Sequence, residues 1–155
     1  MLRSGSENIP GIVGFGKAAE GVARLLASMG GVARLRDRLE KGIRLLLPAS
    51  RLNGHPERRL PNTLNMTLPG FRGESMVMAM DERGVCFSSG SACRSGSPDP
   101  SHALLAMGLS HAEAHCAVRF SLGYGNTEEE IDRTVELLGQ TISQSRNTVH
   151  FVPCR

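Results

Sequence analysis

The apolar positions of this 155-residue chain follow a helical period over its first third. From Gly11 to Leu26 they recur every three or four residues, and the same spacing resumes after Gly30-Gly31. One face of an α-helix produces this spacing. The pattern therefore predicts either one long broken helix or two helices in succession, ended by Pro48.

The rest of the chain mixes short alternating runs with further helical patterns. Residues 49–62 hold Asn-Gly and two prolines and predict a loop. The predicted strands are 64–68, 85–87 and 118–122, and the predicted helices are 72–83, 99–107, 112–116 and a last one opened by the capping box Thr127–Glu130. In the 99–107 helix, we expect Asp99 as N-cap and Pro100 at the first helical position. This order predicts an α/β or α+β layer, with about three strands and helices packed on one side.

Composition narrows the class of protein. The net charge is +3, with 11 Lys/Arg against 5 Asp/Glu in residues 1–60. This basic half predicts a solvated helix face, with a docking surface for an acidic partner as the alternative. With one tyrosine and no tryptophan there is little to stack on bases, so we expect no nucleic acid. We expect a cytoplasmic protein without membrane contact, because no apolar run suits a span or a signal peptide.

The spacing of the cysteines argues against a zinc ribbon and against a thioredoxin-type redox motif. None of the four stands in a Cys-x-x-Cys motif. Cys93 lies in the run Ser88–Ser97, among serines and two glycines, with no bulky apolar neighbour within four positions. A structural thiol usually packs among aliphatic side chains. The run therefore predicts either a displayed, reactive thiol, with Arg94 favouring the thiolate, or an ordinary polar loop that contains a cysteine.

Three other motifs each have a structural and a functional interpretation. Arg119 interrupts an apolar strand pattern and is either an edge residue with a packed stem or a fork for a carboxylate. His111 and His115 stand one helical turn apart, as metal ligands do, but a third ligand is not apparent and helix-end histidines are favoured. The glycines of 11–16 lack the Gly-x-Gly-x-x-Gly spacing, which favours helix packing over phosphate binding.

Taken together, these segments resemble the cysteine desulfurases, in the group with an extended catalytic-cysteine loop. The resemblance is carried by Arg3–Gly16, Pro61–Asn65, the Cys93 loop, Pro100–His102, Val118–Gly123 and the Glu-Glu-Glu-Ile-Asp of the last helix. It covers nearly the whole chain in the same order. It implies the small C-terminal domain of a fold-type I transferase that depends on pyridoxal phosphate.

The resemblance implies a role for three residues. Cys93 matches the nucleophile that takes sulfur from L-cysteine as a persulfide, leaving L-alanine, and that can also contact a nascent iron–sulfur cluster. Arg119 matches the arginine that holds the substrate carboxylate. Ser6 stands where the family has a threonine that bonds the phosphate of the cofactor across a homodimer interface. The implied acceptor is an iron–sulfur scaffold or another sulfur-acceptor protein.

One departure from the family is large. The chain has only two lysines, Lys17 and Lys41, both in helical patterns. The large domain of the family, with its Schiff-base lysine, lies N-terminal to the matching region. We therefore expect residues 1–10 to be a strip of that large domain and 11–155 to be the small domain. Activity would need the missing domain, on a separate chain or in a longer product. The alternative is a truncated remnant that acts as a sulfur carrier or scaffold-binding module.

Overall fold

The computed structural model describes residues 5–90 and 99–147. Its elements are α1 (Ile9–Glu20), α2 (Val22–Leu46), β1 (Arg51–Leu52), β2 (Thr63–Thr67), α3 (Gly73–Asp81), β3 (Ser88–Ser89), α4 (His102–Ala106), α5 (His111–His115), β4 (Ala117–Ser121) and α6 (Glu128–Asn147). The mixture of helices with one small sheet confirms the predicted fold class. The expected packing of helices on one side only is wrong, because helices contact both faces of a sheet that has four strands.

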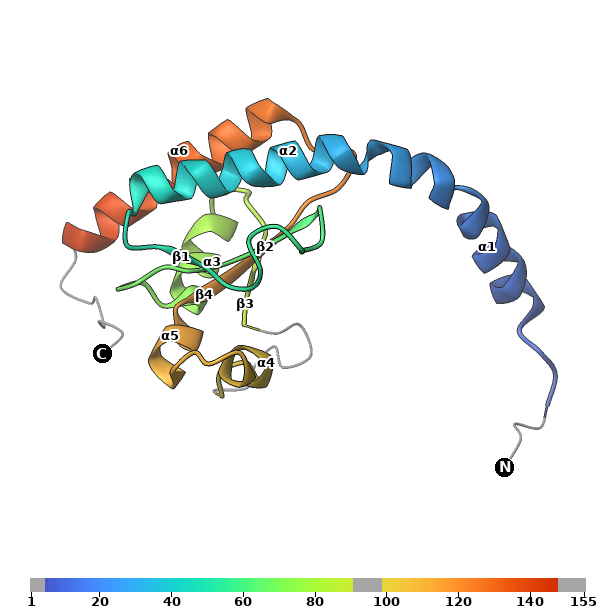
Figure 1. Ribbon diagram of the computed structural model, residues 1–155, viewed down its shortest axis with the longest axis horizontal. Helices are drawn as coiled ribbons and strands as arrows, with labels where there is room; N and C mark the ends of the chain where they lie inside the picture. Colours follow the sequence, from blue (N-terminus) through green and yellow to red (C-terminus); the bar gives the residue numbers. More distant parts are fainter. Residues whose placement is uncertain (1–4, 91–98, 148–155) are drawn as a thin grey trace.

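The helix α1 and the first turns of α2 form an arm that extends from the sheet, whereas the rest of α2 lies over the core (Figure 1). The helical pattern is interrupted at Gly21 rather than at Gly30-Gly31, and two helices follow each other. Glycine costs about 1 kcal/mol in a helix interior relative to alanine, which α2 tolerates because its second half packs on the core. No residue of α1 is buried. Among the described residues, no helix combines the length and apolar character needed to cross a membrane.

The sheet has four antiparallel strands in the order β1-β2-β4-β3. The predicted strands at 64–68 and 118–122 correspond to β2 and β4. The sequence did not predict β1, because two residues are too few to show an alternating pattern. The strand expected at 85–87 forms instead at Ser88–Ser89, which is the segment that pairs with β4. Pairing joins backbone groups, so apolar side chains do not determine where it occurs.

The main core lies on one face of this sheet, under α2, α3 and α6 (Figure 1). Leu64 and Met66 of β2 and Val118 and Phe120 of β4 point into it and are almost fully buried. The spacing of apolar residues in the helices now seen as α3 and α6 predicted which side chains face inward. Most of these predictions are confirmed, because the core contains Met76, Met80, Ile131, Leu138 and Ile142, and Val135 packs against it. Val77, also expected to face inward, is only partly buried and lies outside this core. In addition, α4 and α5 form a smaller cluster with Ala117, which points to the opposite face of β4.

Two helix starts differ from the predicted ones. The helix expected from Asp99 begins at His102, after Ser101. Ser110 caps α5 in a reciprocal capping box with Glu113, a Ser-x-x-Glu signal that the sequence reading did not use. The predicted box of α6 is confirmed, because the Glu130 amide donates to Thr127 Oγ1 and the Thr127 amide donates to a Glu130 carboxylate oxygen.

Gly73, the first residue of α3, lies against the backbone of β4. A Cβ atom there would stand 2.5 Å from the Ala117 carbonyl oxygen, and a backbone oxygen cannot move aside as a side chain can. We expect Gly73→Ala to lower the free energy of unfolding by about 2 kcal/mol. Urea unfolding measures this change.

Gly30→Ala is the matched control, since nothing lies within 4 Å of the added methyl group and the site is helical. We expect this variant to gain up to about 1 kcal/mol. Equal stability of both variants would contradict the close approach of α3 to β4.

Candidate active site

The second face of the sheet is polar. Side chains alternate between the two faces of a strand, so Asn65 and Arg119 point away from the core into which Leu64 and Val118 point. Asn65 pairs with Arg119 across β2 and β4, and Ser88 pairs with Arg119 across β4 and β3. The backbone N–H of Asn53, which follows β1, donates to the backbone carbonyl oxygen of Asn65 and extends the same row to β1. Four polar residues thus form one row across the sheet: Asn53, Asn65, Arg119 and Ser88.

Arg119 is the centre of this row. Its Nε atom is buried and has no hydrogen-bond partner, and the guanidinium forms no ion pair with the described residues. A buried donor that lacks an acceptor costs roughly 1–3 kcal/mol. A planar guanidinium binds a carboxylate through two parallel hydrogen bonds, so a carboxylate-bearing ligand would supply the missing acceptor.

The edge-residue reading of Arg119 is wrong, because β4 lies between β2 and β3. The remaining interpretation, that the guanidinium of Arg119 binds a carboxylate, fits its place in the fold.

The neighbouring row of this face is closed by α4 and α5. Thr67 and Ala117 pair there and are almost fully buried. Glu113 of α5 forms an ion pair with Arg51 of β1. Hydrogen bonds from the Ser110 backbone and side chain, and then from Arg51, lower the pKa of Glu113 below its usual value. The ionised Glu113 therefore ties α5 to β1.

The polar row leads toward the segment that holds Cys93. The two residues of β3 pair with Arg119 and Val118, and Cys93 follows Ser89 by four positions in the sequence. Cys93 itself lies outside the described residues. Four residues span at most about 14 Å, which sets the longest distance between Cys93 and the strand beside Arg119.

Ser6 is described, and it is exposed just before α1. The arm carries this segment away from the sheet, so one chain does not bring Ser6 and Arg119 together (Figure 1). Cys86, expected in a strand, lies instead between α3 and β3 and is exposed, with its Sγ atom 3.8 Å from Asp81 Oδ1.

The lysines do not fit a covalent cofactor site at the polar row. Lys17 pairs with Glu20 on the arm, and Lys41 is exposed on α2. The described residues thus suit the carboxylate of a substrate but supply no amine to anchor pyridoxal phosphate beside it. Residues 5–90 and 99–147 also hold no group of three or more His, Cys, Asp or Glu side chains that could bind a metal ion, and this range includes His111 and His115.

The sequence reading missed Asn53, Asn65 and Ser88. Asn65 could have been found from the alternation in strand 64–68, because its polar positions mark the face opposite the core. Our interpretation used only the apolar positions of this strand. Asn53 could not be found in this way, because it lies in a predicted loop and reaches Asn65 only through the fold.

The match to known families covers most of the chain. Residues 1–134 match the model of the class-V aminotransferases. The chain belongs to the class-V aminotransferase family. Cysteine desulfurase IscS 1 of Archaeoglobus fulgidus is 48% identical over 147 residues, which are 94% of this chain and 38% of that protein. A cysteine desulfurase of Cereibacter sphaeroides is 48% identical over 144 residues, which are 93% of this chain and 37% of that protein.

Solved structures agree with this assignment. A NifS-like protein superimposes with a TM-score of 0.78 at 33% identity, over 92% of this chain and 36% of that one. A NifS-like protein from Rickettsia africae gives a TM-score of 0.74 at 28% identity, over 91% of this chain and 36% of that one. This class-V aminotransferase chain therefore spans little more than a third of the length of the relatives it matches.

Proposed function

We propose that this chain is the cysteine-bearing portion of a cysteine desulfurase. The observation that carries the proposal is the polar row, in which Arg119 has a buried donor without an acceptor and adjoins the strand that leads to Cys93. Arg119 holds the carboxylate of L-cysteine, and Cys93 receives its sulfur. The names of the relatives with 48% identity support the same reaction.

The sulfur transfer balances without an outside oxidant. The Cys93 thiolate attacks the sulfur of L-cysteine, an S–S bond forms, and the C–S bond breaks. Its electron pair stays on the substrate carbon, which takes a proton and becomes the methyl group of L-alanine. Pyridoxal phosphate, when bound, supplies the electron sink that makes this carbon a leaving group. The persulfide on Cys93 then passes to an acceptor, and we propose an iron–sulfur scaffold protein.

The exposed apolar side chains of α1 support the proposal that a partner domain carries the cofactor. Ile12, Val13 and Phe15 of α1 are all more than half exposed, an unusual density of large apolar side chains for a helix facing water. We propose that the large domain of a desulfurase, on a separate chain or a longer product, covers this face. In a homodimer the Ser6 hydroxyl, at the start of the arm, would reach the cofactor phosphate of the second subunit.

Sulfide release from L-cysteine tests the proposal. We expect no release by the purified chain with pyridoxal phosphate and a reductant, because covalent chemistry on this cofactor needs a tuned lysine. We expect release when a separately expressed large domain is added, and loss of that release in Cys93→Ser. Release by the chain alone would contradict the need for a partner.

The second candidate function is a remnant that carries sulfur or binds a scaffold without catalysis. The two lysines outside the polar row favour it. No release in either condition, together with a Cys93 persulfide received from another desulfurase, would select this alternative.

A further inference from the structure

The row across the sheet holds a second unused donor beside Arg119. Asn65 faces Arg119 from the neighbouring strand, and paired side chains on one face of antiparallel strands stand about 5 Å apart at Cβ. Among the described residues, nothing accepts a hydrogen bond from Asn65 Nδ2, whereas Asn65 Oδ1 accepts one from Asn53 Nδ2 at 2.7 Å. A side-chain amide with its oxygen engaged on one side presents its two N–H donors on another.

The orientation of this amide is set by its neighbours on β1 and β2. Asn53 Nδ2 donates to both Asn65 Oδ1 and Thr67 Oγ1, and the Thr67 hydroxyl lies 3.1 Å from Asn53 Oδ1. Thr67 is almost fully buried, so its side chain cannot turn to water. Since β1 lies on the far side of β2 from β4, holding the Asn65 oxygen toward Asn53 directs its nitrogen away from β1.

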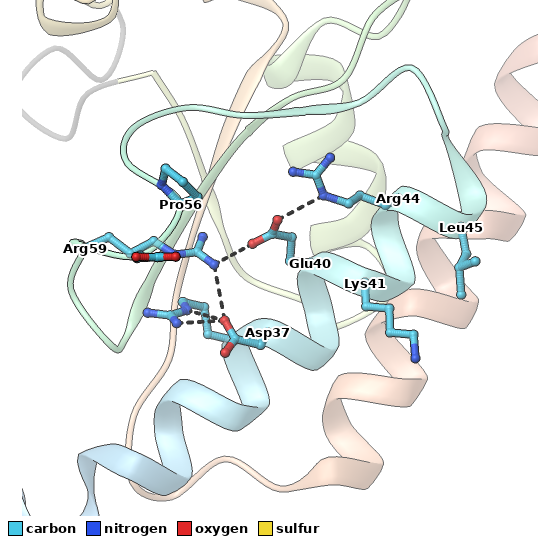
Figure 2. Close-up of a pocket in the computed structure, with 9 residues that line it drawn as sticks. Asp37, Glu40, Lys41, Arg44, Leu45, Pro56 and Arg59 are labelled. Carbon is cyan, nitrogen blue, oxygen red and sulfur yellow. Dashed lines mark hydrogen bonds and ion pairs between the residues drawn. The ribbon is translucent and has the colours of Figure 1, made fainter.

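The position of Asn53 depends on the loop between β1 and β2, which begins at Asn53. The loop returns to α2, where the Arg59 guanidinium lies between Asp37 and Glu40, with an Nη2–Oε2 distance of 2.6 Å to Glu40 (Figure 2). The Arg36 guanidinium donates to the Leu60 carbonyl oxygen at 2.7 Å. Arg36, Arg59 and Glu40 are each largely buried, so these ion pairs and hydrogen bonds fix the path of the loop.

We propose that Asn65 is a second binding residue for the substrate carboxylate, and that Asn53 positions it. The inference rests on the proposed function, because it takes the carboxylate to lie on Arg119. The guanidinium supplies the charge and two donors, while Asn65 Nδ2 adds a donor from the neighbouring strand. A site with donors on two strands selects a carboxylate over an amide, since a substrate amide would place its own N–H groups against these donors.

NMR titration of the purified, isotope-labelled chain tests this inference without the cofactor. The probes are L-alanine, which carries the carboxylate, and L-alaninamide, which does not. We expect L-alanine to shift both the Arg119 Nε–H signal and the Asn65 side-chain amide signals, and L-alaninamide to shift neither. Asn65→Ala is expected to weaken L-alanine binding about tenfold, because a hydrogen bond to a charged group is lost. Asn53→Ala is expected to lower the preference for L-alanine over L-alaninamide while Arg119 still responds.

Asn65→Asp is expected to abolish the shifts, because it opposes one carboxylate with another. Ser143→Asp on α6 is the matched charge control and should bind as the wild type does. Urea unfolding checks that each variant is folded. An Arg119 shift without an Asn65 shift, or full binding by Asn65→Ala, overturns the role of Asn65 and leaves the proposed function standing. Silence of both signals to the limit of L-alanine solubility overturns the carboxylate role of Arg119 as well.

Discussion

Replacing Cys93 with serine is expected to abolish persulfide formation on this chain. The nucleophile in sulfur transfer is a thiolate, and a serine hydroxyl neither ionises near neutral pH nor forms a stable bond to sulfane sulfur. The measurement is intact-protein mass spectrometry after incubation with L-cysteine, pyridoxal phosphate and a large desulfurase domain. The wild type should gain one sulfur atom at Cys93, and the Cys93→Ser variant none.

Cys86 provides the control for this experiment. It is exposed and forms no disulfide, so any unspecific sulfur donor would label it too. Cys86→Ser should therefore keep the full persulfide yield. A sulfur atom that persists in Cys93→Ser, or that disappears in Cys86→Ser, would show that the sulfur acceptor has been assigned to the wrong residue.

Replacing Arg119 is expected to have the second largest effect. Arg119→Gln removes the charge that holds the substrate carboxylate, and truncating one partner of a buried charge pair typically costs 2–5 kcal/mol. We expect kcat/KM for L-cysteine in the reconstituted enzyme to fall about 100-fold or more, with most of the loss in KM. Arg119→Lys should recover only part of the loss, because an ammonium group keeps the charge without the planar fork.

L-cysteine methyl ester separates this role from a structural one. It lacks the carboxylate charge, so the wild type should prefer L-cysteine strongly, and Arg119→Gln should lose that preference while turning over the ester at the wild-type rate. If both substrates lost activity equally in the variant, Arg119 would support the fold of the sheet and not the carboxylate.

Most helices and strands could be predicted from the sequence, because their signals lie within a few neighbouring residues. The capping box at Thr127 places the start of α6 with hydrogen bonds inside one helical turn. The alternation in 64–68 and 118–122 predicts β2 and β4, because each strand buries one face. In contrast, β1 and β3 are two residues long and exist only because β2 and β4 lie beside them. Two residues carry no periodicity, so no reading of the sequence could place them.

The candidate site shows the same division. Sequence resemblance singled out Cys93, Arg119 and Ser6, since each stands in a recognisable stretch of residues. Their roles stay predictions, and the structure brings only Arg119 into a described site. Asn53 and Asn65 are twelve positions apart, and their contact depends on the return of a loop that Arg59 and Glu40 hold.

The sequence by itself determined the family of this protein, the order of its helices and inner strands, and the residues that match its proposed chemistry. Only the tertiary structure decided that β4 is an interior strand, that Arg119 holds a buried donor without an acceptor, and that Asn65 faces it. The physical reason is that pairing between strands joins residues distant in the chain. Such pairing depends on how α2, α3 and α6 cover one face of the sheet and leave a polar row on the other.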